Sequence, residues 1–157
     1  CSVFFKIGPV DCLTINEDVE DNVRVIFSRT KSGIQGRNIL LKALDRIRAA
    51  GIAVPPLDMR LEKRVPPGTG LGGGSGDAAA LLDYLASAGY PVGRFAAEIG
   101  ADVPFLLSRV SAALARGGGG KTLAAAGLPS PMASRRRHTD VALCDGRYVC
   151  QTGRILS

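Results

Sequence analysis

Hydrophobic and polar positions follow a strand pattern in the first part of the chain and a helical pattern after it. Three segments within residues 3–29, around SVFFKI, DCLTI and NVRVIF, are rich in β-branched and aromatic residues. Gly-Pro and acidic turns separate them, which predicts three strands. Residues 38–50 then predict a helix that ends at Gly51. Its inner face would consist of Leu40, Ala43, Leu44 and Ile47.

A further strand and a second helix flank a glycine-rich segment. Residues 56–65 alternate, with Leu57, Met59 and Leu61 on one face, which predicts a strand. After the glycines, apolar residues recur at helical spacing and Asp77 lies off their stripe. These apolar residues are Ala78, Leu81, Leu82 and Leu85. The predicted order is therefore strand, glycine loop, helix, with Gly89 ending the helix.

The remaining elements are shorter. A helix around Phe95 to Ile99 would end at Gly100, and Pro104 would hold Val103 extended in ADVPFLL. The segment SAALA predicts another strand, and periodicity ends after about Gly127. Strands first, then helices interleaved with single strands, predict an α+β sandwich with little parallel βαβ character.

The glycine loop is the main candidate for chemistry. Glycine fills most positions between Gly68 and Gly76, directly before a helix. Such a loop lets several N–H groups point at one anion, most often a phosphate, at the positive end of the helix dipole. A tight glycine turn that only joins two packed elements is the alternative. We therefore expect phosphate binding, with that alternative left open.

Three known phosphate motifs match only in part. Gly68, Gly70 and Gly73 fit the dinucleotide G-x-G-x-x-G, but no second strand ending in an acidic residue follows at the required distance. GGGGKT at 117–122 imitates the end of a P-loop, yet Ala115 stands where that loop needs glycine. The protein-kinase H-R-D and D-F-G motifs are absent. None of the three assignments is supported.

Composition narrows the function classes. The net charge is +6, but five arginines and two aspartates put three of these charges in the last thirty residues. The basic last thirty residues could be an arm that binds nucleic acid or a solvated tail. The lack of Trp argues against stacking on nucleic-acid bases. Four cysteines without C-x-x-C spacing, and His138 as the only histidine, predict no structural metal, although His138, Cys144 and Cys150 could form a zinc site. With no apolar run long enough to span a bilayer and no signal peptide, we expect a cytoplasmic protein without membrane partners.

Two long motifs in order resemble the GHMP family of small-molecule kinases. The family pattern P-x-x-x-G-L-G-G-G-S-S-D-A-A is matched from Pro66 to Ala79, and G-A-D-V-P-F is matched at 100–105. ARGGGGKTL at 115–123 resembles A-R-G-x-G-E-x-L. The resemblance implies the family's N-terminal ATP-binding domain over 1–127, incomplete at its start, and an atypical, poorly ordered basic tail over 128–157. Since the family's second domain is not matched, we expect a chain incomplete at both ends.

The resemblance also implies a reaction and its residues. ATP, with Mg²⁺, would donate its γ-phosphoryl group to a hydroxyl of a small cytidylyl sugar alcohol in isoprenoid precursor synthesis. Asp102 would orient and deprotonate that hydroxyl, although outside the family it would be interpreted as a turn or cap residue. The expected nucleotide-binding residues are Asn38, Ile39, Lys63, Pro66, Gly68, Gly70, Leu71, Gly72, Gly73, Gly74, Ser75 and Gly76.

Departures from the family keep alternatives open. The family's catalytic lysine has no counterpart here, and Gly76 stands where the family has a second serine. Asn38, Ile39 and Lys63 can also be interpreted as a cap, a core residue and a surface residue. The alternatives are a catalytically inactive nucleotide-binding chain and a basic RNA-interacting protein. A homodimer is a further expectation, because an uncovered domain face would expose apolar surface.

Overall fold

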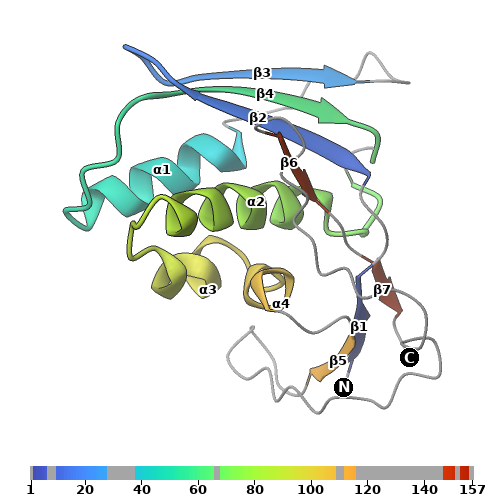
Figure 1. Cartoon of the computed structure of the whole chain (residues 1–157). Helices are drawn as coiled ribbons and strands as arrows, with labels where there is room; N and C mark the ends of the chain where they lie inside the picture. Colours follow the sequence, from blue (N-terminus) through green and yellow to red (C-terminus); the bar gives the residue numbers. More distant parts are fainter. Residues whose placement is uncertain are drawn as a thin grey trace.

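The computed structural model describes residues 2–6, 10–27, 38–65, 68–108, 112–115, 147–150 and 153–155. A four-stranded sheet covers one side of two layers of helices, and a small three-stranded sheet lies at one end (Figure 1).

The larger sheet has the order β3-β4-β2-β6. Its strands are β2 (Asp11–Glu17), β3 (Asn22–Phe27), β4 (Leu57–Lys63) and β6 (Arg147–Cys150). β2 pairs antiparallel with β4 and β6, whereas β3 and β4 run parallel. Helix α1 (Ile39–Ala49) connects that parallel pair, so the described strands contain one βαβ crossover in an otherwise antiparallel sheet.

The smaller sheet has the order β5-β1-β7 and is antiparallel. It consists of β1 (Ser2–Phe5), β5 (Ala112–Ala115) and β7 (Gly153–Ile155). Phe4 on β1 packs on Phe105, with ring centroids 5.4 Å apart, and Ala113 completes this small core. The small sheet is thereby joined to the helical layer.

In the described part of the chain, four helical segments follow β4. They are α2 (Gly73–Ser87), the 3₁₀ helix η1 (Gly93–Phe95), α3 (Ala96–Ile99) and α4 (Val103–Leu107). α1 and α2 lie directly against the large sheet, and α3 and α4 lie beneath α2 (Figure 1). The main core forms between them, where Leu13, Met59 and Leu61 of the sheet meet Leu44 and Leu82 of the helices. Burial of this apolar surface, at about 25 cal/mol per Å², is the principal stabilising contribution.

Most predicted elements are confirmed. The three early strands, the helix of residues 39–49 with its four inner residues, the alternating strand before the glycines and the helix after them all appear. The segment around 111–115 contains strand β5, and the short helix ends before Gly100. The α+β class is confirmed as well.

The prediction that Pro104 holds Val103 extended is wrong. Residues Val103–Leu107 form α4, in which Pro104 occupies the first turn. Proline is tolerated there because the N–H groups of a helix's first turn have no intrahelical acceptor. Leu106 N donates to Asp102 O at 3.1 Å, so the helix closes despite the proline.

Two strands fall in a region for which the sequence pattern predicted none. β6 pairs with β2, and β7 pairs with β1, although both belong to residues 128–157. The division of the chain at residue 127 stays a prediction. The four-glycine turn, the Arg-rich run and His138 lie outside the described residues.

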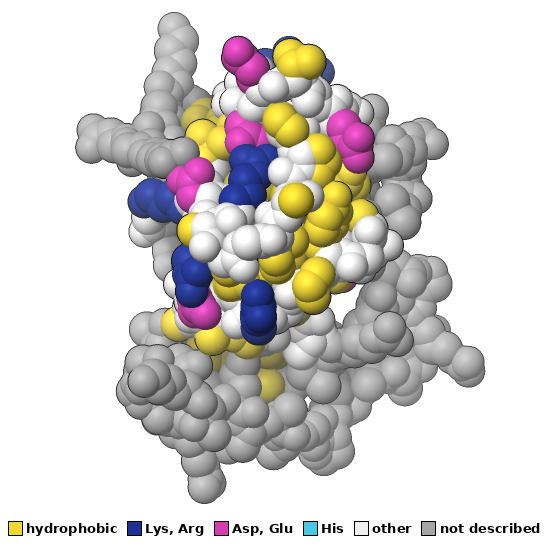
Figure 2. Space-filling model, turned by 90° about the vertical axis from the view of Figure 1, so that its left-hand side faces the viewer, with side chains coloured by type: hydrophobic (Ala, Val, Ile, Leu, Met, Phe, Trp, Pro, Cys, Tyr) yellow, Lys and Arg dark blue, Asp and Glu magenta, His cyan; other side chains and the backbone are white. Residues whose placement is uncertain are grey.

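Hydrophobic side chains gather at the centre of one face of the molecule, with basic and acidic side chains around them (Figure 2). Among the described residues, no helix is long and apolar enough to cross a membrane.

Candidate functional site

The glycine loop joins the end of β4 to the start of α2. Gly68, Gly70 and Gly72 have φ angles of 81°, 72° and 70°. Residues that carry a side chain rarely adopt this left-handed backbone conformation. The conformation of the loop alone therefore explains these three glycines, and no bound ligand is needed to explain them. α2 begins at Gly73, so the last glycines of the motif form the first helical turn rather than the loop.

The N-terminus of α2 is uncapped by side chains. Gly72 is the N-cap residue and provides no side-chain hydrogen bond, and the first turn contains no acidic residue. The first N–H groups of a helix have no intrahelical acceptor and lie at the positive end of its dipole. The N-terminus of α2 can therefore bind an anion such as a phosphate group.

A pocket of about 680 Å³ opens beside this helix end. Its walls come from the start of α1, the end of β4, the glycine loop, the first turns of α2 and the end of α3. The lining residues are Asn38, Ile39, Lys42, Ala43, Arg46, Lys63, Val65, Gly68, Thr69, Gly70, Leu71, Gly72, Gly73, Gly74, Ser75, Asp77, Glu98 and Ile99. The volume lies in the range of small-molecule and cofactor sites.

Most predicted nucleotide-binding residues line this pocket. Asn38, Ile39, Lys63 and the predicted loop residues from Gly68 to Ser75 all do. Gly76 does not: it is buried within α2. Pro66 lies outside the described residues.

Sequence reasoning missed several charged residues of the pocket. Lys42 and Arg46 follow Asn38 at steps of four, so one face of α1 presents all three. Glu98 forms an ion pair with Arg46, whose guanidinium carbon lies 5.4 Å from the centre of the Phe95 ring. The spacing on α1 was the available signal for Lys42 and Arg46. No comparable signal marked Glu98.

Asn38 has two roles in the structure. Its Oδ1 accepts a hydrogen bond from Leu40 N at 2.9 Å, which caps α1. The same residue lines the pocket. The interpretation of Asn38 as a cap is confirmed, and its role in binding a nucleotide stays a prediction.

Lys63 is buried, so its interpretation as a surface residue is wrong. Its Nζ lies 2.5 Å from Asp11 Oδ2 and 2.9 Å from Asp77 Oδ2. The three side chains are each at most 5% exposed. Burial lowers the pKa of Lys63, but the charges and hydrogen bonds of Asp77 and Asp11 outweigh it and raise this pKa overall. Lys63 is therefore a charged residue beneath the glycine loop.

The pKa of Asp77 is raised as well, which in a carboxylate favours the neutral form. Burial raises the pKa of Asp77 to about 7, although the charge and hydrogen bond of Lys63 oppose the shift and the charge of Asp11 adds to it. Asp11 also accepts hydrogen bonds from the N–H groups of Arg64 and Val65. Around neutral pH, Asp77 therefore holds a proton part of the time.

Asp102 directly precedes α4 and is partly exposed. It lies in a turn and occupies the N-cap position of α4, as the interpretation as a turn or cap residue predicted, but its side chain makes no capping hydrogen bond. Asp102 does not line the pocket described above. Its catalytic role remains a prediction.

The turn that contains Asp102 lies close to the start of α2. A Cβ added at Gly100 would lie 3.5 Å from Ser75 Oγ and 3.2 Å from Val103 Cγ2. Gly100 thus permits close packing of the two motifs, which are 25 positions apart in the sequence.

The other end of α4 is held by Lys6 of the first described segment. Lys6 Nζ donates to Ser108 O and lies 5.5 Å from the centre of the Phe105 ring.

The domain family follows from a direct comparison. Residues 38–109 match the model of the GHMP kinases N terminal domain. These residues include α1, β4, the glycine loop and all of the helical segments after it. The chain carries the N-terminal domain of this kinase family, as its motifs implied.

Individual relatives are more specific. The chain is similar to the 4-diphosphocytidyl-2-C-methyl-D-erythritol kinase of Oleidesulfovibrio alaskensis, with 41% identity over 120 residues, which is 72% of this chain and 35% of the relative. The enzyme of the same name from Salinibacter ruber is 43% identical over 112 residues, 68% of this chain and 39% of the relative. The chain therefore spans little more than a third of these curated relatives.

A solved structure gives the same result. The crystal structure of a 4-(cytidine 5'-diphospho)-2C-methyl-D-erythritol kinase matches with a TM-score of 0.54 and 36% identity, over 75% of this chain and 41% of that chain. The fold, the glycine loop and the relatives thus agree on one family.

Proposed function

We propose that this chain binds ATP and takes part in transferring its γ-phosphoryl group to the 2-hydroxyl of 4-diphosphocytidyl-2-C-methyl-D-erythritol. The observation that carries the proposal is the uncapped N-terminus of α2, with its glycine loop, at a pocket of about 680 Å³. The similarity to kinases of this name supports the choice of substrate. The product would serve isoprenoid precursor synthesis, with the reaction in the cytoplasm.

Phosphoryl transfer depends mainly on positioning and on neutralising charge. In this chain the first-turn N–H groups of α2 would hold the nucleotide phosphates, and Asn38 and Ile39 would lie near the base. Asp102 would orient and deprotonate the accepting hydroxyl. Gly100, two residues before Asp102, lies near Ser75 at the start of α2, which supports this role.

Mg²⁺ would arrive with the nucleotide. No group of three or more His, Cys, Asp or Glu side chains suited to a metal occurs among the described residues. Magnesium in kinase sites is instead bound largely by substrate phosphates and water with one or two protein oxygens. The Ser75 hydroxyl lines the pocket at the first turn of α2 and fits that requirement. The ion would neutralise charge on the phosphates.

The test is calorimetry with Mg-ATP and a phosphorylation assay with the cytidylyl substrate on one preparation of the chain. Binding together with turnover supports the proposal. Binding without turnover supports the alternative of a catalytically inactive nucleotide-binding chain. Absence of ATP binding contradicts both.

A further inference from the structure

The cluster of Asp11, Lys63 and Asp77 connects both sides of the glycine loop. Lys63 Nζ donates to Asp11 Oδ2 at 2.5 Å and to both oxygens of Asp77, at 2.9 and 3.2 Å. Asp11 Oδ1 accepts from Arg64 N at 2.6 Å and from Val65 N at 3.0 Å. The cluster therefore binds the backbone where the loop leaves β4 and the side chain of Asp77 on α2.

The start of α2 also rests on this cluster. A Cβ added at Gly73 would lie 3.2 Å from Lys63 Nζ and 3.3 Å from Val65 Cγ1. Lys63 is held by two carboxylates and has little freedom to move away. The first helical residue therefore lies close to the same ammonium group that pairs with Asp11, whose other oxygen binds the loop backbone.

The charges of the cluster do not cancel. Two carboxylates face one ammonium group, and all three are buried. Lys63 and Asp77 line the pocket together with Gly72, Gly73 and Ser75. A phosphate bound at the start of α2 would add negative charge beside this excess, which favours protonation of a carboxylate.

We propose that Asp11, Lys63 and Asp77 are positioning residues of the nucleotide site, which hold the glycine loop in place and take up a proton when phosphate binds. The inference rests on the proposed ATP binding. We assign the proton to Asp77, because Asp11 already accepts hydrogen bonds from three donors, Arg64 N, Val65 N and Lys63 Nζ. Its pKa of about 7 in the free protein puts the uptake in the neutral range.

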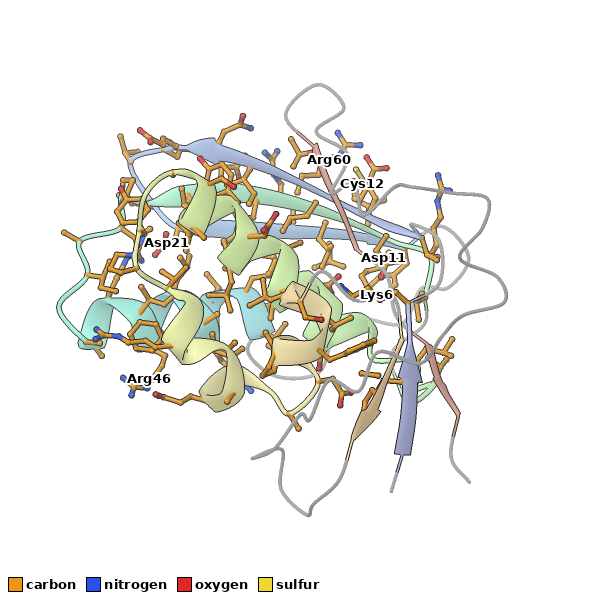
Figure 3. The ribbon with its side chains drawn as sticks, turned by 60° about the horizontal axis from the view of Figure 1, so that its bottom comes forward. Lys6, Asp11, Cys12, Asp21, Arg46 and Arg60 are labelled. Atoms are coloured by element: carbon orange, nitrogen blue, oxygen red, sulfur yellow. The ribbon has the colours of Figure 1, made fainter. Side chains whose placement is uncertain are left out.

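Charged groups around Asp77 are consistent with this assignment. In the described part of the chain, Lys63 faces it from β4 and Asp11 from β2. Lys42 and Arg46 of α1 and Glu98 of α3 line the same pocket, and Arg46 is paired with Glu98. Asp11 and Asp21 lie at opposite ends of the sheet (Figure 3).

The first experiment needs no ligand. Amide hydrogen exchange is measured for residues 64, 65 and 68–72 in the wild-type chain and in Asp11→Asn, Asp77→Asn and Asp83→Asn. Asp83→Asn is the matched control, because it changes the same kind of side chain on the same helix outside the pocket. Exchange in the loop should be at least several-fold faster in Asp11→Asn and Asp77→Asn, with α1 unchanged. If Asp11→Asn does not fold, Asp77→Asn decides, and unchanged loop exchange overturns the positioning role.

The second experiment measures proton uptake. Calorimetric titration with Mg-ATP, in two buffers of different ionisation enthalpy, gives the protons taken up on binding between pH 6 and 8. The affinity of the wild-type chain should fall as pH rises, by at most about tenfold per pH unit for one proton. Asp77→Asn should lose the part of the proton uptake that comes from Asp77, and Asp83→Asn should keep it. Ionisation of ATP itself contributes equally in the wild type and in both variants, so it cancels in the comparison.

The outcomes separate the two claims. Equal proton uptake in the wild type and Asp77→Asn overturns the proton-linked part while ATP binding stands. A wild-type chain that binds no ATP overturns both the proposed function and the proton uptake. Loop exchange then still decides whether the cluster positions the loop.

Discussion

Glycines of the loop differ in what requires them. Gly68, Gly70 and Gly72 are required by their positive φ angles, and Gly73 because an added Cβ would crowd Lys63 and Val65. Gly74 differs from these, because an added Cβ would meet nothing within 4 Å although the residue lines the pocket. Nothing in the fold demands glycine there, whereas a phosphate in the pocket would.

We therefore predict that Gly74→Ala preserves the fold and weakens ATP binding. Alanine in place of a helical glycine stabilises by up to about 1 kcal/mol, so the melting temperature should stay equal or rise. The methyl group would occupy space next to the phosphates and lower ATP affinity at least several-fold in calorimetry. Gly93→Ala, which also meets nothing within 4 Å, lies outside the pocket and is the control. Wild-type affinity in Gly74→Ala would mean that this glycine does not face the nucleotide.

At Asp102 we predict loss of turnover without loss of nucleotide binding. Asp102→Asn keeps the size of the side chain but removes the base, so the rate should fall by about 10²-fold or more. ATP affinity should be unchanged, because Asp102 does not line the pocket. Initial rates measure the turnover and calorimetry measures the ATP affinity, both on the same preparation. Asp18 is exposed, and Asp18→Asn is the control. Turnover close to that of the wild type would assign Asp102 a structural role.

Sequence reasoning found the loop because its residues are contiguous, and it missed the buried cluster because its members are not. Asp11 lies 52 positions before Lys63, and the pairing of β2 with β4 brings them together. A signal did exist: Lys63 continues the inward series of Leu57, Met59 and Leu61. An inward-facing lysine needs a buried counter-charge, which alternation alone does not locate.

At the scale of elements, Arg48 connects three of them at the end of the sheet remote from the pocket. Its Nε donates to Val54 O at 3.0 Å, its Nη2 donates to Pro55 O at 2.7 Å, and the guanidinium pairs with Asp21. Asp21 also accepts from Leu57 N at 2.9 Å. The end of α1, the turn between β2 and β3 and the start of β4 are thereby held together.

We predict that Arg48→Ala lowers the free energy of unfolding by about 1–3 kcal/mol, since several hydrogen bonds of a charged group are lost. Arg48→Lys should recover only part of this, because a lysine cannot donate to the carboxylate and to both carbonyls in one plane. Urea unfolding checks the values, and ATP affinity should not change. Arg60→Ala is the control: Arg60 is exposed and, among the described residues, is ion-paired with Glu62, so its loss should cost less than about 1 kcal/mol. Equal effects of Arg48→Ala and Arg60→Ala would contradict the proposed connection.

Long periodic elements were predictable and short ones were not. α1 and β4 show their patterns over several turns or alternations, so their inner residues were identified correctly. α4 has five residues, too few for a helical period, and its proline favoured the wrong prediction. β6 and β7 have four and three residues, and their places depend on pairing with β2 and β1, which are distant in sequence.

At the scale of the whole molecule, α2 is the central element. Its sides pack against the large sheet and against α4, while its N-terminus opens to the pocket (Figure 1). The burial that stabilises the fold and the exposed helix end that would bind phosphate therefore belong to one helix. The cost is a buried carboxylate, Asp77, in the second turn of α2. The homodimer stays a prediction that light scattering can check.

Asp77 should make the stability of the whole chain depend on pH in an unusual direction. Its pKa is raised from 3.8 to about 7 in the folded protein, mainly by burial. Between about pH 4 and pH 7 the folded state therefore holds more protons at this site than the unfolded state. The free energy of unfolding then falls as pH rises through this window, by at most about 1.4 kcal/mol per pH unit, and levels off above pH 7. An ordinary ion-paired carboxylate would give the opposite slope.

We predict that Asp77→Asn removes this fall, because an amide does not titrate and Lys63 keeps its partner Asp11. Urea unfolding at several pH values from 4.5 to 7.5 gives the free energies of unfolding for the wild type, Asp77→Asn and Asp83→Asn. As pH rises, the free energy of unfolding of the wild type should fall relative to that of Asp77→Asn. The difference between the wild type and Asp83→Asn should not change with pH. A constant difference between the wild type and Asp77→Asn would show that Asp77 is ionised throughout, and that Lys63 compensates fully for its burial.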